Sequence, residues 1–112
     1  MRQHTIVYKT WGMEIWYENL DYCGKMLIFA EDHRCSMHYH AVKHETFVVM
    51  TGRILLEMGN EPRILKRGES AYIPRGISHR MTAIGGNASL IEFSSHHEDS
   101  DSYRVESGQV WE

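Results

Sequence analysis

Cysteine, positive charge and long apolar segments are scarce in this 112-residue sequence, and each scarcity excludes a class of protein. The two cysteines, Cys23 and Cys35, are too few for the disulfide framework of a small secreted domain, so we expect reduced thiols. No apolar run approaches the ~20 residues that a membrane helix needs, and the first residues lack the apolar stretch of a signal peptide. We therefore expect a cytoplasmic protein without a membrane partner.

Basic residues do not dominate the sequence either. It holds 12 Lys and Arg against 15 Asp and Glu, a formal net charge of -3. The longest basic run is Lys66-Arg67. Binding to a nucleic-acid backbone depends on a clustered positive surface, so we expect no nucleic-acid partner.

Short segments rich in β-branched and aromatic residues make up most of the chain, and Gly, Pro and Asn separate them. No window has the i, i+3, i+4, i+7 apolar period of a helix. The length suits a single domain. We therefore predict one all-β domain, a sandwich or barrel over residues 1–94, followed by a polar tail over 95–112. The expected strands cover residues 5–9, 13–18, 25–30, 36–40, 46–50, 53–58, 63–65, 70–73, 79–82 and 88–94.

Histidine is abundant, with eight residues, and four potential metal ligands stand at regular places among the expected strands. Because side chains alternate along a strand, His38 and His40 point to the same face. Glu45 begins the next strand, so its carboxylate lies beside the two imidazoles if those strands pair. His79 follows the tight turn 74–76, which returns the chain across the barrel. Imidazoles with one carboxylate suit a divalent Fe, Mn, Ni, Co or Zn ion.

Two segments that contain these residues resemble the two sequence motifs of the cupin superfamily. Residues 38–52 match HxH, four residues, Glu, six residues, Gly. Residues 68–79 match Gly, five residues, PxGxxH. The resemblance implies a jelly-roll barrel, the double-stranded β-helix, with one metal ion inside it, held by His38, His40, Glu45 and His79. Asp32 and Ala83 depart from the usual Gly and Asn, at positions that supply no ligand.

Shorter matches resemble the cupin module of type II mannose-6-phosphate isomerases: Lys-x-Trp-Gly at 9–12, Leu-Ile-Glu-Phe at 90–93 and Asp-x-x-Arg at 101–104. Those isomerases usually have Gln where this chain has His38. Other metal-dependent sugar isomerases with cupin folds, including the archaeal phosphoglucose type, do resemble the HxH set. The resemblance implies an aldose-ketose isomerase acting on a sugar or sugar phosphate.

Such an isomerase moves a proton between C1 and C2 of the sugar, which requires a metal ion as Lewis acid and a general base that is not a ligand. Glu92 is the candidate base because strand alternation can place it inward. The alternatives are His44, His96 and His97.

Two basic residues are candidates for holding an anionic substrate. Lys25 shares a strand face with the apolar Leu27 and Phe29, and we assign it to catalysis as well. Arg104 suits bidentate capture of a phosphate or carboxylate. The alternative is that Lys25 extends to the rim of the barrel and that Arg104 pairs with an acidic neighbour in the tail.

The tail and the N-terminal aromatic residues suggest contacts beyond the barrel. The anchors Tyr103, Val105, Val110 and Trp111 predict that the tail docks on the barrel or on a second subunit. A second metal site among His96, His97, Glu98, Asp99 and Asp101 is a less favoured alternative. The N-terminal aromatics exceed what a small barrel buries, so we expect a homodimer. Two other functions stay open, a non-haem iron dioxygenase and a non-catalytic sugar-binding protein.

Overall fold

The structure is a computed structural model that describes residues 4–105, and it confirms the expected all-β architecture. None of the helices in this range is long and apolar enough to cross a membrane. The chain forms the strands β1 (Thr5–Lys9), β2 (Gly12–Asn19), β3 (Tyr22–Phe29), β4 (His38–Tyr39), β5 (Glu45–Thr51), β6 (Arg53–Met58), β7 (Glu61–Lys66), β8 (Ser70–Ile73), β9 (His79–Ala83), β10 (Ala88–Ser95) and β11 (Tyr103–Arg104), with a 3₁₀ turn η1 (Asp99–Asp101) before the last strand.

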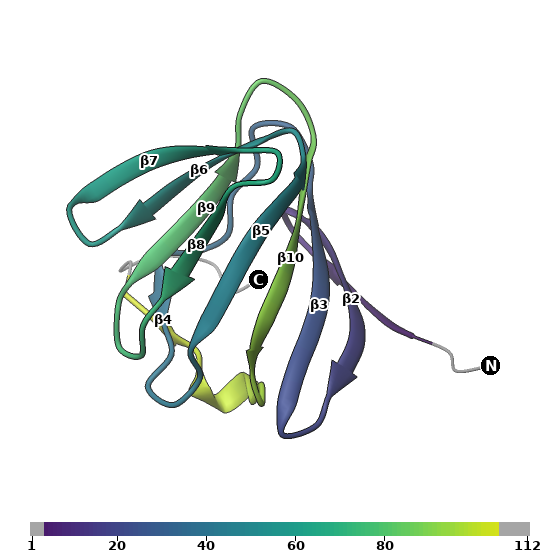
Figure 1. The fold of residues 1–112 in the computed structure, drawn as a ribbon, viewed down its shortest axis with the longest axis vertical. Coiled ribbons are helices and arrows are strands. Elements are labelled where there is room, and N and C mark those ends of the chain that lie inside the picture. Colours follow the sequence, from purple (N-terminus) through teal and green to yellow (C-terminus); the bar gives the residue numbers. More distant parts are fainter. Residues whose placement is uncertain (1–3, 106–112) are drawn as a thin grey trace.

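Two antiparallel sheets face each other, as Figure 1 shows. The larger sheet has the strand order β1-β2-β3-β10-β5-β8, and the smaller has the order β11-β4-β9-β6-β7. Residues far apart in sequence therefore become neighbours. Both β3 and β5 flank the late strand β10, and β4 lies between β9 and the C-terminal β11.

The apolar core lies between the sheets, because inward and outward side chains alternate along the central strands. Strands β3, β5, β9 and β10 alternate buried and partly exposed residues over most of their length. Five core side chains have no exposed surface: Phe29, Val49, Ile54, Ala83 and Leu90. Cys23 and Cys35 are buried free thiols.

The ten expected strands all form, with small shifts of their ends, and the segment expected to be a polar tail adds an eleventh. Strand β4 is shorter than expected and keeps only His38–Tyr39 of residues 36–40. After β10, the chain makes η1 and then β11, which pairs with β4. Tyr103 lies opposite Tyr39, and their rings stack with centroids 5.0 Å apart. Val110 and Trp111 lie outside the described residues.

Candidate metal centre and cavity

Three histidines come together because β4 and β9 are paired neighbours. His38 lies directly opposite His79 in the register of these strands, and His40 follows β4. One ligand atom from each of the three lies within 4.8 Å of the others. This is the one group of three or more potential ligands identified among residues 4–105.

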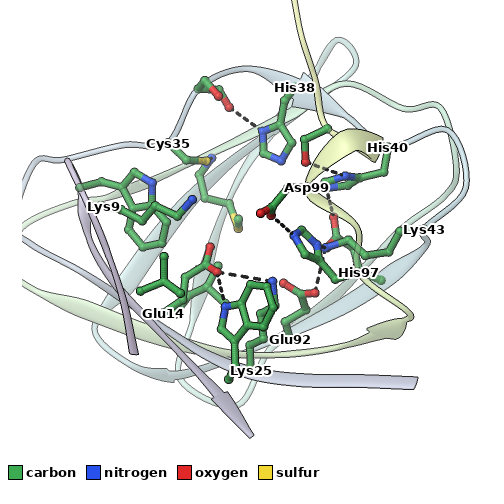
Figure 2. A pocket seen from close by; sticks show the side chains of 18 of the residues that line it. Lys9, Glu14, Lys25, Cys35, His38, His40, Lys43, Glu92, His97 and Asp99 are labelled. Carbon is green, nitrogen blue, oxygen red and sulfur yellow. Dashed lines mark hydrogen bonds and ion pairs between the residues drawn. The ribbon is translucent and has the colours of Figure 1, made fainter. Parts of the chain in front are cut away.

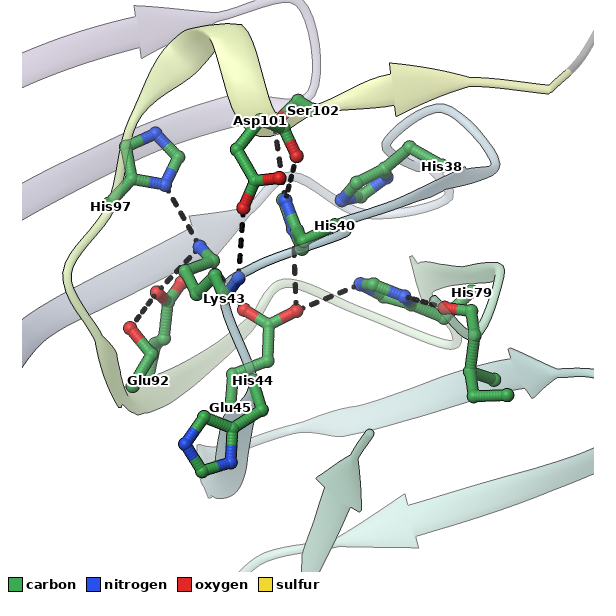
Figure 3. Close-up of polar contacts among 12 residues, drawn as sticks. His38, His40, Lys43, His44, Glu45, His79, Glu92, His97, Asp101 and Ser102 are labelled. Atoms are coloured by element: carbon green, nitrogen blue, oxygen red, sulfur yellow. Dashed lines mark hydrogen bonds and ion pairs between the residues drawn. The ribbon is translucent and has the colours of Figure 1, made fainter. Parts of the chain in front are cut away.

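Glu45 lies beside two of these histidines and comes from the opposite sheet. Its Oε2 lies 3.0 Å from His79 Nε2 and 3.5 Å from His40 Nε2. We expected Glu45 to reach the histidines if its strand paired with theirs, but β4 and β5 belong to different sheets. The carboxylate reaches the imidazoles across the barrel interior, and Figure 3 shows it between His40, His79 and Lys43.

Each of the three imidazoles uses its Nδ1 in a hydrogen bond to a main-chain carbonyl. His38 Nδ1 is 2.8 Å from Ser36 O, and His79 Nδ1 is 3.0 Å from Ile77 O. His40 Nδ1 is 3.1 Å from the main-chain oxygen of Asp101. A carbonyl oxygen only accepts, so Nδ1 carries the proton in each bond, and Nε2 is the ring nitrogen left for another partner.

The centre is therefore a cluster of buried acceptor atoms, and its chemistry fits a cation. Burial and the neighbouring His79 lower the pKa of His38 to about 3, so that its ring is neutral at pH 7. Burial also lowers the pKa of His40, to about 4. Burial alone would raise the pKa of Glu45, but contacts with His79 and Lys43 outweigh it and lower that pKa. Three imidazoles and a carboxylate match the preferences of first-row divalent metals.

The turn of the second sequence motif is attached to the first motif by a main-chain bond. Gly76 has φ of 78°, a left-handed conformation that favours glycine, and its N–H donates to His40 O at 2.7 Å. The next residue, Ile77, supplies the carbonyl that orients His79. The turn thus holds His40 and His79, two of the candidate ligands, in fixed positions relative to each other.

The C-terminal segment also supports the centre, through Asp101. Its buried carboxylate accepts N–H bonds from Ala41 at 2.9 Å, Val42 at 3.1 Å and Lys43 at 2.9 Å. Burial would raise the pKa of this carboxyl, but these main-chain donors outweigh it and lower the pKa. Because the Asp101 carbonyl also accepts from His40, one residue orients both a candidate ligand and the loop that leads to Glu45.

A cavity of about 460 Å³ opens beside the histidines, and Figure 2 shows the charged side chains that point into it. Glu92 is one of them, 3% exposed, as the alternation of β10 predicts. Its Oε2 accepts from Ser94 Oγ at 2.7 Å and from Lys43 Nζ at 3.0 Å, with Cys23 Sγ at 3.9 Å.

Lys43 is the main feature of the cavity that our sequence reasoning missed. It is 3% exposed, and its Nζ lies 3.3 Å from Glu45 Oε1 and 2.9 Å from His97 Nδ1, in addition to Glu92. Burial would lower its pKa, but Glu92 and Glu45 outweigh burial and raise it. Residues 41–44 lie in the gap between the expected strands 36–40 and 46–50, so we did not consider Lys43 as a cavity residue. The signal was available, since Lys43 stands two residues before Glu45 and therefore on the same face of an extended chain.

Lys25 and Arg104 both line the cavity, from different sheets. Lys25 is 1% exposed and does not extend to the rim. Its Nζ lies 3.4 Å from Glu14 Oε1 and 4.0 Å from the centroid of the Trp16 ring. Its cross-strand partner on β10 is Glu92. Arg104 lies opposite His38 in the register of β11 and β4, so a basic residue stands next to the candidate metal centre.

The three alternative histidines occupy different places. His44 Nδ1 bonds to the hydroxyl of Tyr72 at 2.9 Å, and His96 Nε2 pairs with Glu98 at 2.7 Å; neither residue lines the cavity. His97 does line it, bonded to Lys43 and to Asp99 Oδ1 at 2.8 Å.

Comparisons with known proteins agree with this architecture. A family model described as "Cupin domain" matches residues 25–94. An uncharacterised protein of Aquifex aeolicus is 37% identical over 70 residues, 62% of this chain and 58% of that protein. A mannose-1-phosphate guanylyltransferase of Salmonella montevideo is 31% identical over 99 residues, 82% of this chain but 20% of the enzyme. The chain thus spans less than two thirds of the length of these relatives.

Solved structures show the same fold at low sequence identity. The capsular polysaccharide assembling protein CapF from Staphylococcus aureus superposes with a TM-score of 0.84 and 17% identity, over 95% of this chain and 35% of CapF. At that identity the likeness establishes the fold alone.

Proposed function

The chain belongs to the cupin family, and from that premise we propose that it is a metal-dependent aldose-ketose isomerase acting on a sugar or sugar phosphate. One observation carries the proposal: the cavity beside the four-donor centre contains a separate buried carboxylate, Glu92. Isomerisation needs both parts, a Lewis acid at the carbonyl and a base at the neighbouring carbon.

The donor set is His38, His40, Glu45 and His79, and it would hold the ion through three Nε2 atoms and a carboxylate oxygen. When bound, a divalent ion supplies Lewis-acid polarisation of a carbonyl oxygen and so acidifies the adjacent C–H bond. Fixed Nδ1 bonds keep the three rings oriented toward that position. Glu45, as a ligand, is not the base.

Glu92 is the proposed general base. Its bonds from Lys43 and Ser94 converge on Oε2. Oε1 has no hydrogen-bond partner among residues 4–105, so it is the oxygen that takes the proton from one carbon and returns it to the next. The ammonium group of Lys43, which is bonded to Oε2, balances the negative charge of the Glu92 carboxylate.

The charges of the cavity favour an anionic substrate. Its lining includes four basic and four acidic residues: Lys9, Lys25, Lys43, Arg104, Glu14, Glu45, Glu92 and Asp99. A divalent ion added to this balanced set leaves the cavity with net positive charge. Arg104 and Lys25 are the proposed contacts of the anionic group, and Lys25 also stands opposite Glu92. A sugar phosphate therefore fits better than a neutral sugar.

Two comparisons support carbohydrate chemistry without defining it. The names of the Salmonella relative and of CapF refer to a sugar phosphate and to a polysaccharide. Since this chain covers only a part of each, the activity of the whole relative is not transferred to it.

The test is an isomerisation assay over a panel of aldoses, ketoses and their phosphates, with the protein loaded in turn with Mn, Fe, Ni, Co and Zn. We expect metal-dependent interconversion of one pair, and we expect Glu92→Gln to abolish it while metal content stays the same. Glu61→Gln, on an exposed position of β7, is the matched control. Absence of turnover on the whole panel would refute the proposal. Fe-dependent oxygen uptake would indicate a dioxygenase, and thermal stabilisation by a sugar without product would indicate a binding protein.

A further inference from the structure

The ammonium group of Lys43 has three acceptor atoms around it, one for each of its N–H bonds. Its Nζ lies 3.0 Å from Glu92 Oε2, 3.3 Å from Glu45 Oε1 and 2.9 Å from His97 Nδ1. An ammonium group has three donors and no acceptor. All three N–H bonds therefore end on the protein, and Lys43 is held in place rather than offered to a substrate (Figure 3).

The contact with Lys43 determines which nitrogen of His97 carries the proton. Since the ammonium group only donates, His97 Nδ1 accepts and the ring is neutral. The ring proton is then on Nε2, which donates to Asp99 Oδ1 at 2.8 Å. Burial and the Lys43 ammonium group lower the pKa of His97, which agrees with a neutral ring. This tautomer is the opposite of the one in the three candidate ligand histidines, whose Nδ1 atoms donate.

His97 lies on the irregular segment between β10 and η1, so contacts with other elements determine its position. The side-chain amide of Asn19, at the end of β2, pairs with the main chain of His97. Its Oδ1 accepts from His97 N at 2.8 Å, and its Nδ2 donates to His97 O at 3.0 Å. The imidazole also packs at 79° to the ring of Trp16, with centroids 5.2 Å apart. Two residues of β2 thus hold His97 at the cavity wall.

The preceding residue, His96, shows that this placement is particular to His97. Each of the two histidines pairs through Nε2 with a carboxylate two residues later, His96 with Glu98 at 2.7 Å and His97 with Asp99 at 2.8 Å. The His96 side chain is 44% exposed, and its Nδ1 bonds to Leu20 O outside the cavity. The His97 side chain is 10% exposed, and its Nδ1 contacts the buried Lys43. The two pairs therefore differ in what Nδ1 contacts.

We propose that His97 is a positioning residue of the isomerase. It holds the Lys43 ammonium group, and through it the Glu92 carboxylate, in the orientation that leaves Glu92 Oε1 free for the substrate. This proposal rests on the isomerase function and on Glu92 as its base. Ser94 Oγ donates to the same Oε2 at 2.7 Å, so two fixed donors set the rotation of the carboxylate.

Loss of His97 should affect the rate because it releases one of the three bonds that hold Lys43. The ammonium group then has a free N–H and shifts toward Glu45 or toward a substrate oxygen. Glu92 Oε2 loses a fixed donor, and its carboxylate turns away from the reacting carbon. A displacement of about 1 Å at a reacting group costs roughly 100-fold in rate.

Asp99 acts one step further out and should matter less than His97. It keeps the ring proton on Nε2, but its side chain is 89% exposed, so that water can replace it as the acceptor. Exposed polar pairs contribute little, so Asp99→Leu should lower kcat about fivefold or less.

The first test compares His97→Leu with the matched control His96→Leu in the metal-loaded protein, on the sugar pair that the isomerisation panel identifies. We expect His97→Leu to lower kcat about 10–100-fold with KM and metal content unchanged, because both ring nitrogens contact the protein rather than the substrate. His97→Asn keeps an acceptor oxygen near the place of Nδ1 and should recover most of the loss. His96→Leu should stay within about twofold of wild type. A His97→Leu enzyme with the kcat of wild type, or with only a raised KM, would overturn the proposal.

The second test needs no turnover, so it separates this proposal from the isomerase function. In ¹⁵N NMR spectra of the Zn-loaded chain we expect His97 to be protonated at Nε2 and the Lys43 ammonium signal to exchange slowly with water. That signal should disappear in His97→Leu and persist in His96→Leu. If these signals are as expected and wild type converts no sugar, the isomerase function fails and the positioning of Lys43 by His97 stands.

Two NMR results would overturn the positioning role even in an active enzyme. One is a His97 ring protonated at Nδ1, and the other is a Lys43 signal that is unchanged in His97→Leu. The tautomer is measured in wild type, so the proposal stays testable if His97→Leu does not fold.

Discussion

Replacing Lys43 by methionine should strongly destabilise the metal-free protein. The ammonium group lies 3.0 Å from Glu92 and 3.3 Å from Glu45, and all three side chains are at most 4% exposed. Methionine keeps the length of the side chain but leaves two carboxylates buried without their common countercharge. Removing one partner of a buried ion pair costs about 3–5 kcal/mol.

That loss is large for a domain of this size. Folding free energies are about 5–15 kcal/mol, so Lys43→Met removes roughly a third or more of a typical value. At about 4 °C per kcal/mol for a domain near 100 residues, the melting temperature should fall by roughly 12–20 °C. Urea unfolding in the presence of a chelator measures the difference directly.

Two further variants separate the charge effect from a general packing defect. Lys43→Met combined with Glu92→Gln should regain part of the lost stability, because one of the two uncompensated charges is then absent. Lys66→Met, at an exposed position of β7, should stay within about 0.5 kcal/mol of wild type. A Lys43→Met protein as stable as wild type, or a double variant no more stable than the single one, would refute the reasoning.

Three other predictions follow from the structure. Asp101→Ala removes the acceptor of three N–H groups, so amide exchange at 41–43 should become faster. Metal binding, measured by competition with a chelator, should weaken about 10–100-fold. The control variant Glu98→Ala should show neither effect. Arg80 donates to both oxygens of Glu57 and lowers the pKa of that carboxyl. The pair therefore stabilises the fold fully at pH values above the unfolded-state pKa of about 4.3. This contribution disappears as pH falls through the lower pKa that Glu57 has in the folded protein. Glu57→Gln should therefore cost up to about 1 kcal/mol in urea unfolding at pH 7 and nothing in acid. Cys23 and Cys35, 2% and 5% exposed, should resist a thiol reagent in the native protein and react with it in urea.

Much of the fold could be predicted from sequence because alternation and turn chemistry are local properties. The strands β1, β6 and β8 have the expected ends, and the inward position of Glu92 follows from the alternation of β10. The candidate metal ligands were named from the spacing of His38 and His40 and from the two motifs, and the structure brings the three histidines together. These features require no knowledge of which strand lies beside which.

What sequence could not provide is the pairing of distant segments. That Glu45 approaches the histidines from the opposite sheet depends on the order of the strands. The bonds from the loop 41–43 to Asp101 connect positions about sixty residues apart. A polar tail offers no periodicity from which β11 or its register with β4 could be inferred. Lys43 is different, since its alternation with Glu45 was visible and was overlooked.

The most direct test of the proposed metal centre is the metal content of the purified chain and of its ligand variants. It is measured by mass spectrometry after equilibration with Zn, Mn, Fe, Ni or Co. We expect one ion per chain with the preferred metal, loss of that ion in His38→Ala, His40→Ala and His79→Ala, and no change in His96→Ala, whose ring pairs with Glu98 at the surface. A folded wild-type chain that binds no divalent ion, or one that keeps full occupancy when His79 is removed, would contradict it.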